Sequence, residues 1–392
     1  MAWSPRAGDL AVVDVAGLDA LIMALADASY DVRGPVVRSG AIEPGPLGGV
    51  VDLPRGMRDE QAPGRYDLSD TAGGAFFDWS SSARSWKAEL FPPEEELWRA
   101  RQEPGGNVTF LSTPKASRRE PLPLAILGLR PCDFAALGVT DRVFAGAAVP
   151  DPRYRRRRDT AFMAVVECGS PGGTCFCSSM GTGPGCEGTD AAPDLVLTEI
   201  ASGTVADHRF LVRVVSDRGA EVMAAVPTRK ATEADRSERE AILSRAAARM
   251  GRRLVTEGLP ELLLANLDHE RWSEVARRCL ACGNCTSACP TCFCADVRDT
   301  TELSGQVVRR RRWASCFDRE HSYLHGGAVR ASTSSRYRQW MTHKLATWWD
   351  QFGQSGCVGC GRCITWCPVG IDITEEAAAL RGAALPAGGG AA

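Results

Sequence analysis

The stretch RCLACGNCTSACP at residues 278–290 decides how this chain is interpreted, and GCVGCGRCITWCP at 356–368 repeats its spacing. Both stretches contain the pattern Cys-x-x-Cys-x-x-Cys-x-x-x-Cys-Pro. Four thiolates at this spacing suit a [4Fe–4S] cube, because a short loop presents successive sulfurs on one concave side. Gly283, Gly359 and Gly361 allow the backbone to curl closely at these loops. The proline after the fourth cysteine prevents an ordinary hydrogen-bonded turn from continuing.

In two-cluster ferredoxins the fourth cysteine of each run ligates the other cluster. The predicted ligands of cluster one are therefore Cys279, Cys282, Cys285 and Cys367. The predicted ligands of cluster two are Cys357, Cys360, Cys363 and Cys289. Crossed ligation holds two clusters close enough for electrons to pass between them. The sequence therefore predicts two [4Fe–4S] clusters and an electron-carrying role.

Zinc is the alternative occupant of these cysteines. A zinc ribbon completes its tetrahedron with separated Cys-x-x-Cys pairs, so a third cysteine at the same short spacing is surplus. Disulfides are disfavoured, because the chain is expected to be cytoplasmic, where thiols stay reduced. Its first apolar stretch, residues 10–25, is interrupted by Asp14, Gly17 and Asp19 and suits neither a signal peptide nor a membrane span. No other window approaches the roughly 20 apolar residues that a span needs.

The remaining composition excludes other classes of function. A formal net charge of −2 gives no general attraction to nucleic acid, so the Arg runs at 155–158 and 309–312 are interpreted as solvated or partner-facing surface. No G-x-G-x-x-G follows a predicted strand, and no P-loop is present. The chain itself therefore lacks the common fingerprints of a nucleotide site.

Four further cysteines are candidates for a third cluster. Cys132 and Cys168 each follow an apolar run of strand length, at 124–129 and 162–166. If these strands are parallel neighbours, both cysteines emerge at the same carboxyl edge of a sheet. A Gly-rich loop then supplies Cys175 and Cys177. The alternative is that these four are buried or reactive thiols without metal.

Four cysteines remain without an assigned role: Cys186, Cys292, Cys294 and Cys316. The tetrapeptide Thr-Cys-Phe-Cys occurs at 174–177 and again at 291–294. Its second copy directly follows the first cluster motif, where its thiols could shield a cluster or act as spare ligands.

The predicted fold class is an α/β (mixed α+β) N-terminal region followed by a mainly helical, ferredoxin-like domain with two [4Fe–4S] clusters and a long insertion. The predicted divisions are a mixed region at 1–120, an α/β domain at 121–265, the cluster domain at 266–380 with its insertion at 290–356, and a flexible tail at 381–392. Further strands are expected at 194–198 and 210–215 and helix at 232–264, with Asp235 as its N-cap and Glu238 completing a capping box. The aromatic insertion is expected to pack over the clusters and restrict solvent.

Several segments together resemble the iron–sulfur beta subunit of cytosolic sulfhydrogenases, which are NADP-linked [NiFe] hydrogenases, and the related iron–sulfur subunit of anaerobic sulfite reductase. Besides the two cysteine motifs, the resemblance includes residues 127–133 (LGLRPCD), 175–184 (CFCSSMGTGP) and 337–340 (YRQW). It extends from about residue 18 to residue 380.

The resemblance implies a non-catalytic relay. In such complexes an FAD subunit that handles NAD(P)H exchanges electrons with this subunit, which exchanges them with the subunit that holds the terminal site. The hydrogenase complex is favoured over the sulfite reductase complex, although the motifs do not separate the two. Two further hypotheses are a self-contained flavin-dependent iron–sulfur oxidoreductase and an assembly factor that uses the cysteines as zinc staples.

Overall fold

The computed structural model describes residues 3–71, 73–82, 84–103, 106–111, 122–187, 192–201, 207–303 and 305–382. The tail predicted at 381–392 lies outside these residues except for Arg381 and Gly382.

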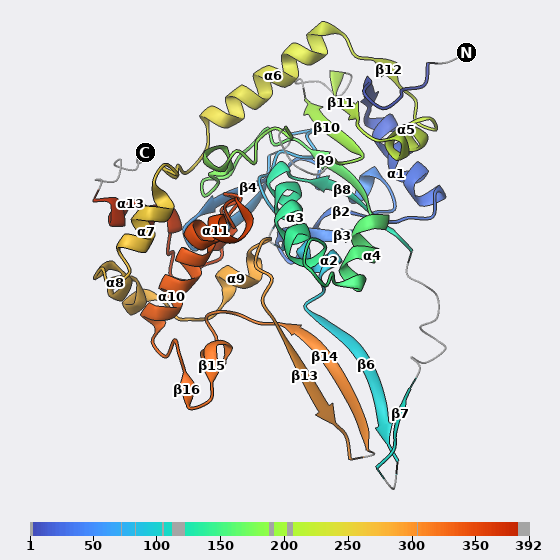
Figure 1. Ribbon diagram of the computed structural model, residues 1–392. Coiled ribbons are helices and arrows are strands. Elements are labelled where there is room, and N and C mark those ends of the chain that lie inside the picture. Colours follow the sequence, from blue (N-terminus) through green and yellow to red (C-terminus); the bar gives the residue numbers. More distant parts are fainter. Residues whose placement is uncertain are drawn as a thin grey trace.

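An eight-stranded mixed sheet, in the order β12-β1-β11-β10-β9-β8-β2-β3, forms the centre of the N-terminal part (Figure 1). Four adjacent strands run parallel: β2 (Asp31–Arg38), β8 (Leu124–Leu129), β9 (Phe162–Val166) and β10 (Leu195–Ile200). Its outer strands are antiparallel: β1 (Leu10–Asp14), β3 (Ala41–Pro46), β11 (Arg209–Val214) and β12 (Arg229–Lys230). All four strands expected after residue 120 are confirmed. They could be recognised because a strand that is buried on both faces has a nearly continuous run of apolar residues.

Helices cover both faces of this sheet. Alternate strand residues point to opposite sides, so Leu127 packs in the layer of α1 (Val15–Asp27) while Ile126 packs beneath α3 (Pro131–Phe144). The other helices of these layers are α2 (Lys87–Leu90), α4 (Pro152–Thr160) and α5 (Asp217–Met223). Five aromatic side chains are buried among these elements: Phe76, Phe77, Trp79, Trp86 and Phe91.

The helix expected at 232–264 is two helices, α6 (Glu233–Ala248) and α7 (Leu259–Ala265). Thr232, rather than Asp235, is the N-cap of α6, and Asp235 is the third helical residue of the capping box. Thr232 Oγ1 accepts a hydrogen bond from the Asp235 N–H at 3.3 Å, while Asp235 Oδ2 accepts one from the Thr232 N–H at 2.8 Å. The predicted partner Glu238 instead binds Arg209.

A second, four-stranded sheet projects from the body of the protein (Figure 1). It joins β13 (Ala295–Thr301) and β14 (Gln306–Trp313) of the predicted insertion to β6 (Glu94–Gln102) and β7 (Val108–Phe110). The Arg run at 309–312 lies on β14, where it forms ion pairs with Glu94, Glu95 and Glu96 of β6. The prediction of a mainly helical C-terminal domain is therefore not confirmed. That domain contains the strands β13 and β14, and β14 pairs with β6 from the N-terminal part of the chain.

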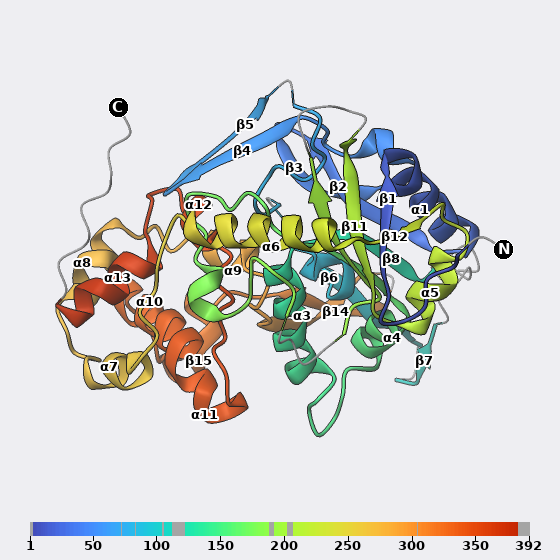
Figure 2. The same ribbon diagram turned by 90° about the horizontal axis from the view of Figure 1, so that it is seen from above.

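Small hairpins and helices complete the chain. The hairpins are β4 (Met57–Ala62) with β5 (Arg65–Asp70), and β15 (Tyr323–Leu324) with β16 (Gly327–Ala328). The remaining helices are α8 (Arg271–Arg278), α9 (Asn284–Ala288), α10 (Thr333–Thr342), α11 (Trp348–Phe352), α12 (Arg362–Thr365) and α13 (Ile373–Arg381). Figure 2 shows α7, α8, α10, α11 and α13 gathered at one end of the molecule, beside the eight-stranded sheet.

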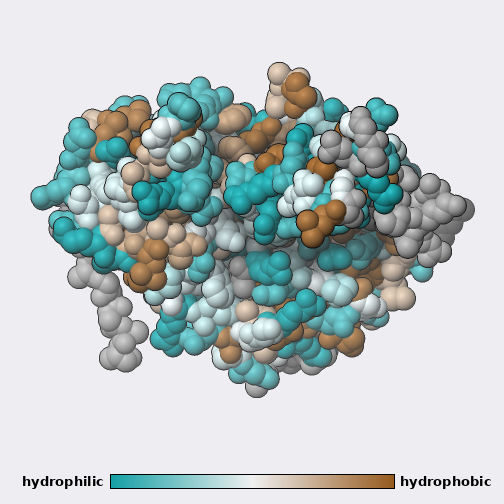
Figure 3. Space-filling model, turned by 90° about the horizontal axis from the view of Figure 1, so that it is seen from below, coloured by the Kyte–Doolittle hydropathy of each residue, from teal (hydrophilic) through white to brown (hydrophobic). Residues whose placement is uncertain are grey.

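Apolar side chains are scattered over the one face of the molecule that Figure 3 shows. Viewed from the side toward which the second sheet points, hydrophobic side chains form separate spots on a largely hydrophilic surface (Figure 3). In the part of the chain that the structure describes, no helix combines the length and the apolar character needed to cross a bilayer.

Candidate functional site

The two cysteine motifs fold into loops with the same backbone conformation. Ala281 and Gly283 have φ angles of 52° and 77°, and the equivalent Gly359 and Gly361 have φ angles of 67° and 76°. These left-handed residues curl each loop before a short helix, α9 in the first motif and α12 in the second. The repeated spacing in the sequence thus becomes a repeated three-dimensional loop.

Each loop also directs a backbone N–H at its own first cysteine. The Ala281 N–H donates to Cys279 Sγ at 3.4 Å, and the Gly359 N–H donates to Cys357 Sγ at 3.4 Å. Such hydrogen bonds favour the thiolate, which is the form of cysteine that binds metal.

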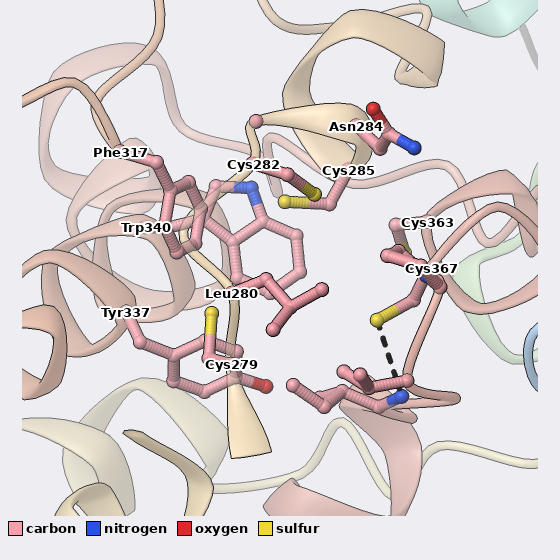
Figure 4. A pocket seen from close by; sticks show the side chains of 14 residues that line it. Cys279, Leu280, Cys282, Asn284, Cys285, Phe317, Tyr337, Trp340, Cys363 and Cys367 are labelled. Carbon is pink, nitrogen blue, oxygen red and sulfur yellow. Dashed lines mark hydrogen bonds between the residues drawn. The ribbon is translucent and has the colours of Figure 1, made fainter. Parts of the chain in front are cut away.

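Sulfurs from both motifs line one cavity (Figure 4). Its cysteines are Cys279, Cys282 and Cys285 of the first motif and Cys363 and Cys367 of the second. The space among its lining residues is about 420 Å³, part of it open to solvent. Cys367 Sγ accepts a hydrogen bond from the Ile371 N–H at 3.3 Å, which the dashed line in Figure 4 marks. The fold therefore brings Cys367 to the first loop, as crossed ligation requires.

The complementary set forms around Cys289. This buried cysteine is close enough to Cys357, Cys360 and Cys363 for its charge to act on all three. Burial raises the pKa of Cys357 to about 12, and repulsion from Cys289 and Cys360 adds to the increase. Burial also raises the pKa of Cys360 and Cys363, whereas a hydrogen bond with Cys292 and the charge of Lys344 hold the pKa of Cys289 well below its ordinary value. Metal binding is therefore linked to the loss of protons from Cys357, Cys360 and Cys363.

The donors around the cavity suit a sulfur-rich cluster. Trp340 Nε1 and the Tyr337 hydroxyl are buried polar groups on α10 without a hydrogen-bond partner among the described residues, and both side chains line the cavity (Figure 4). Burial raises the pKa of Tyr337 well above its usual value, so the hydroxyl keeps its proton. An unpaired buried donor is costly, and cluster sulfides or thiolates would supply acceptors. The insertion therefore contributes the aromatic wall that the sequence predicts over the clusters.

A buried lysine lies beside the second set. Lys344, whose residue is 6% exposed, places Nζ 3.3 Å from Cys289 Sγ and 3.6 Å from Cys292 Sγ. Burial alone would lower the pKa of this amine, but the neighbouring cysteines, Cys289 first, raise it well above its ordinary value. A second lysine, Lys87, donates from Nζ to the Cys292 carbonyl at 2.9 Å.

Sequence reasoning missed these lysines as functional residues. The available signal was their rarity, since only four of the 46 basic residues are Lys and two of the four lie here.

The candidate third set is also brought together. The strands β8 and β9 are parallel neighbours, so Cys132 and Cys168 emerge at one edge of the sheet, as expected. Cys175 and Cys177 arrive on the loop that follows β9. All four cysteines are buried.

The other cysteines have separate positions. Cys292, Cys294 and Cys316 line one cavity with His321 and His343. Cys186 is buried elsewhere: its N–H donates to Glu167 Oε1 at 3.1 Å, and its carbonyl accepts from Arg213 at 2.8 Å. Among the described residues, no three His, Cys, Asp or Glu side chains are close enough to surround a single metal ion.

Comparisons with known proteins agree with this geometry. A sequence family described as a 4Fe–4S dicluster domain matches residues 278–371, which span both motifs. Sulfhydrogenase 2 subunit beta of Pyrococcus furiosus is 33% identical over 250 residues, which cover 63% of this chain and 71% of the relative. The chain therefore belongs to the family of sulfhydrogenase beta subunits and carries a 4Fe–4S dicluster domain.

Proposed function

We propose that this protein is the electron-transfer subunit of a cytoplasmic oxidoreductase complex and that it holds two [4Fe–4S] clusters. The observation that carries the proposal is the shared cavity, because Cys363 and Cys367 line it with three cysteines located some 80 positions earlier. Cluster one takes Cys279, Cys282, Cys285 and Cys367, and cluster two takes Cys357, Cys360, Cys363 and Cys289. The clusters supply one-electron chemistry, while the chain positions them and limits their access to water.

The proposed partners are an FAD subunit that handles NAD(P)H and a [NiFe] hydrogenase subunit. Membership in the sulfhydrogenase family favours hydrogenase over the alternative, which is the corresponding iron–sulfur subunit of a sulfite reductase complex. The predicted divisions at residues 120, 265 and 380 remain predictions.

The self-contained flavin enzyme is the less favoured hypothesis. Its main support is the Gly-rich segment 181–184, which could approach a phosphate. In the structure Thr182 Oγ1 instead donates to the Val358 carbonyl at 2.6 Å, and a Cβ on Gly183 would lie 2.9 Å from Cys177 Sγ. The segment thus packs against cysteine-bearing loops, which accounts for its small residues.

The relay is tested with the complete chain purified without oxygen. We expect iron and acid-labile sulfide, an EPR signal from interacting reduced clusters, and no oxidation of NADPH or hydrogen by the isolated protein. Adding the protein to a complex that lacks it should restore electron flow. Appreciable NADPH or hydrogen oxidation by the isolated protein, or zinc without iron, would contradict the proposal.

Lys344→Met should lower the reduction potential of cluster two by on the order of 100 mV, because reduction adds negative charge that the nearby ammonium stabilises. The measurement is an EPR-monitored redox titration of the anaerobic protein. The control is Lys230→Met on the exposed strand β12, which should leave both midpoints in place. Equal midpoints in Lys344→Met and the wild type would show that Lys344 has no electrostatic effect on the cluster.

A further inference from the structure

Cys132, Cys168, Cys175 and Cys177 come from three separate segments but form one group. Cys132 is the second residue of α3, Cys168 follows β9, and the other two lie beside the short 3-10 turn that begins at Cys177. Cys177 is close enough to Cys132, Cys168 and Cys175 for electrostatic interaction with each, and Cys168 is similarly close to Cys175. None of the four belongs to the dicluster motifs.

A buried cation without an anionic partner adjoins this group. Arg130 is 1% exposed, and its guanidinium acts electrostatically on Cys168. It donates to backbone carbonyls, including Ser80 O at 2.9 Å and Phe77 O at 2.8 Å, and it stacks on Trp79. It forms no ion pair with any carboxylate of the described residues. A charge buried in this way is expensive unless an opposite charge lies nearby.

The start of α3 adds a second source of positive potential. This helix spans Pro131–Phe144, so Cys132 lies in its first turn, where the macrodipole favours a thiolate. A cluster held by four thiolates carries net negative charge. Arg130 and the helix thus oppose burial and the neighbouring Asp133 carboxylate, which raise the pKa of Cys132.

The four cysteines also adjoin the loop of the second motif. The Phe176 N–H donates to the Gly359 carbonyl at 2.8 Å, so the segment that carries Cys175 and Cys177 runs directly along this loop. A Cβ on Gly359 would lie 2.6 Å from the Phe176 carbonyl oxygen. Only glycine therefore fits where the two loops come this close. Cys360 of the second motif acts electrostatically on both Cys132 and Cys177.

We propose that Cys132, Cys168, Cys175 and Cys177 bind a third [4Fe–4S] cluster at the carboxyl edge of the eight-stranded sheet, adjacent to cluster two. This inference rests on the proposed function, which it extends into a series of three centres. The order is cluster one in the open cavity, cluster two around Cys289, and the third cluster against the sheet. In each transfer one centre loses the electron that its neighbour gains.

The test is the iron and sulfide content of the complete chain prepared without oxygen. With four iron atoms per cluster, the wild type should contain about twelve, and Cys177→Ala should contain about eight, a loss of about one third. The matched control is Cys186→Ala, which removes a buried cysteine outside the group and should retain the wild-type content. Iron-edge anomalous diffraction from wild-type crystals gives an answer independent of folding in the variants, and a third peak beside Cys132 is expected.

Three results would overturn the third cluster. They are a wild type with about eight iron atoms, an unchanged iron content in Cys177→Ala, and zinc at the site beside Cys132. Each of them leaves the two-cluster relay intact. A failure of the proposed function would look different, because the wild-type protein would then also lack iron at the two dicluster motifs.

Discussion

Replacing Cys367 with alanine is expected to remove cluster one, although Cys367 belongs to the second sequence motif. The reason is its position, since it lines the same cavity as Cys279, Cys282 and Cys285. The substitution leaves one corner of the cube without its protein ligand, which loosens that iron first and then the cluster, so up to about four iron atoms per chain should be lost. Electron transfer through the assembled complex should fall to background, because electrons can no longer pass through cluster one.

The measurement is iron content together with EPR of the reduced protein. Cys282→Ala and Cys367→Ala should give the same remaining spectrum, and Cys289→Ala should share its spectrum with Cys360→Ala. The control is Cys186→Ala, which should keep both signals. If Cys367→Ala instead matched Cys360→Ala, each motif would bind its own cluster and crossed ligation would be wrong.

Asp133→Ala is expected to destabilise the protein by about 3–5 kcal/mol, because it leaves a buried charge without its partner. Arg362 is a residue of the second motif, is 0% exposed and contacts Asp133 at the start of α3. Its Nη1 lies 2.8 Å from Asp133 Oδ1, and its Nη2 donates to Asp133 Oδ2 at 3.0 Å. Its Nε donates to the Ser82 carbonyl at 2.8 Å. Together these contacts tie the C-terminal cluster loop to the sheet.

The change in stability is measured as the urea midpoint of unfolding, followed by far-UV circular dichroism under anaerobic conditions. The matched control is Glu94→Ala, which breaks ion pairs with Arg310 and Arg312; the Glu94 side chain is 48% exposed, and those of its partners are 33% and 57% exposed. Exposed pairs contribute about 0–1 kcal/mol, so the control midpoint should hardly move. Equal midpoints for the two variants would show that the Asp133–Arg362 pair does not stabilise the fold.

Much of the fold could be predicted because its signals are local. The strands β8 and β9 are short apolar runs, and their boundaries match the prediction residue for residue. The cap of α6 lies three residues before its predicted position, because Thr232 and Asp235 are both good capping residues and only the reciprocal hydrogen bonds distinguish their positions. The pairing of β6 with β14 could not be predicted, since no local signal links Glu94–Glu96 to an Arg run more than 200 positions later.

By itself, the sequence determined the spacing of the thiols in each motif and the glycines that let each loop curl, because a cube needs its ligands at short fixed intervals. Only the tertiary structure decided which thiols face one another, which buried donors and cations surround them, and how Cys132 and Cys168 meet Cys175 and Cys177. The physical reason is range: loop conformation depends on neighbouring residues, whereas burial and electrostatic environment depend on segments that meet only when the chain has folded.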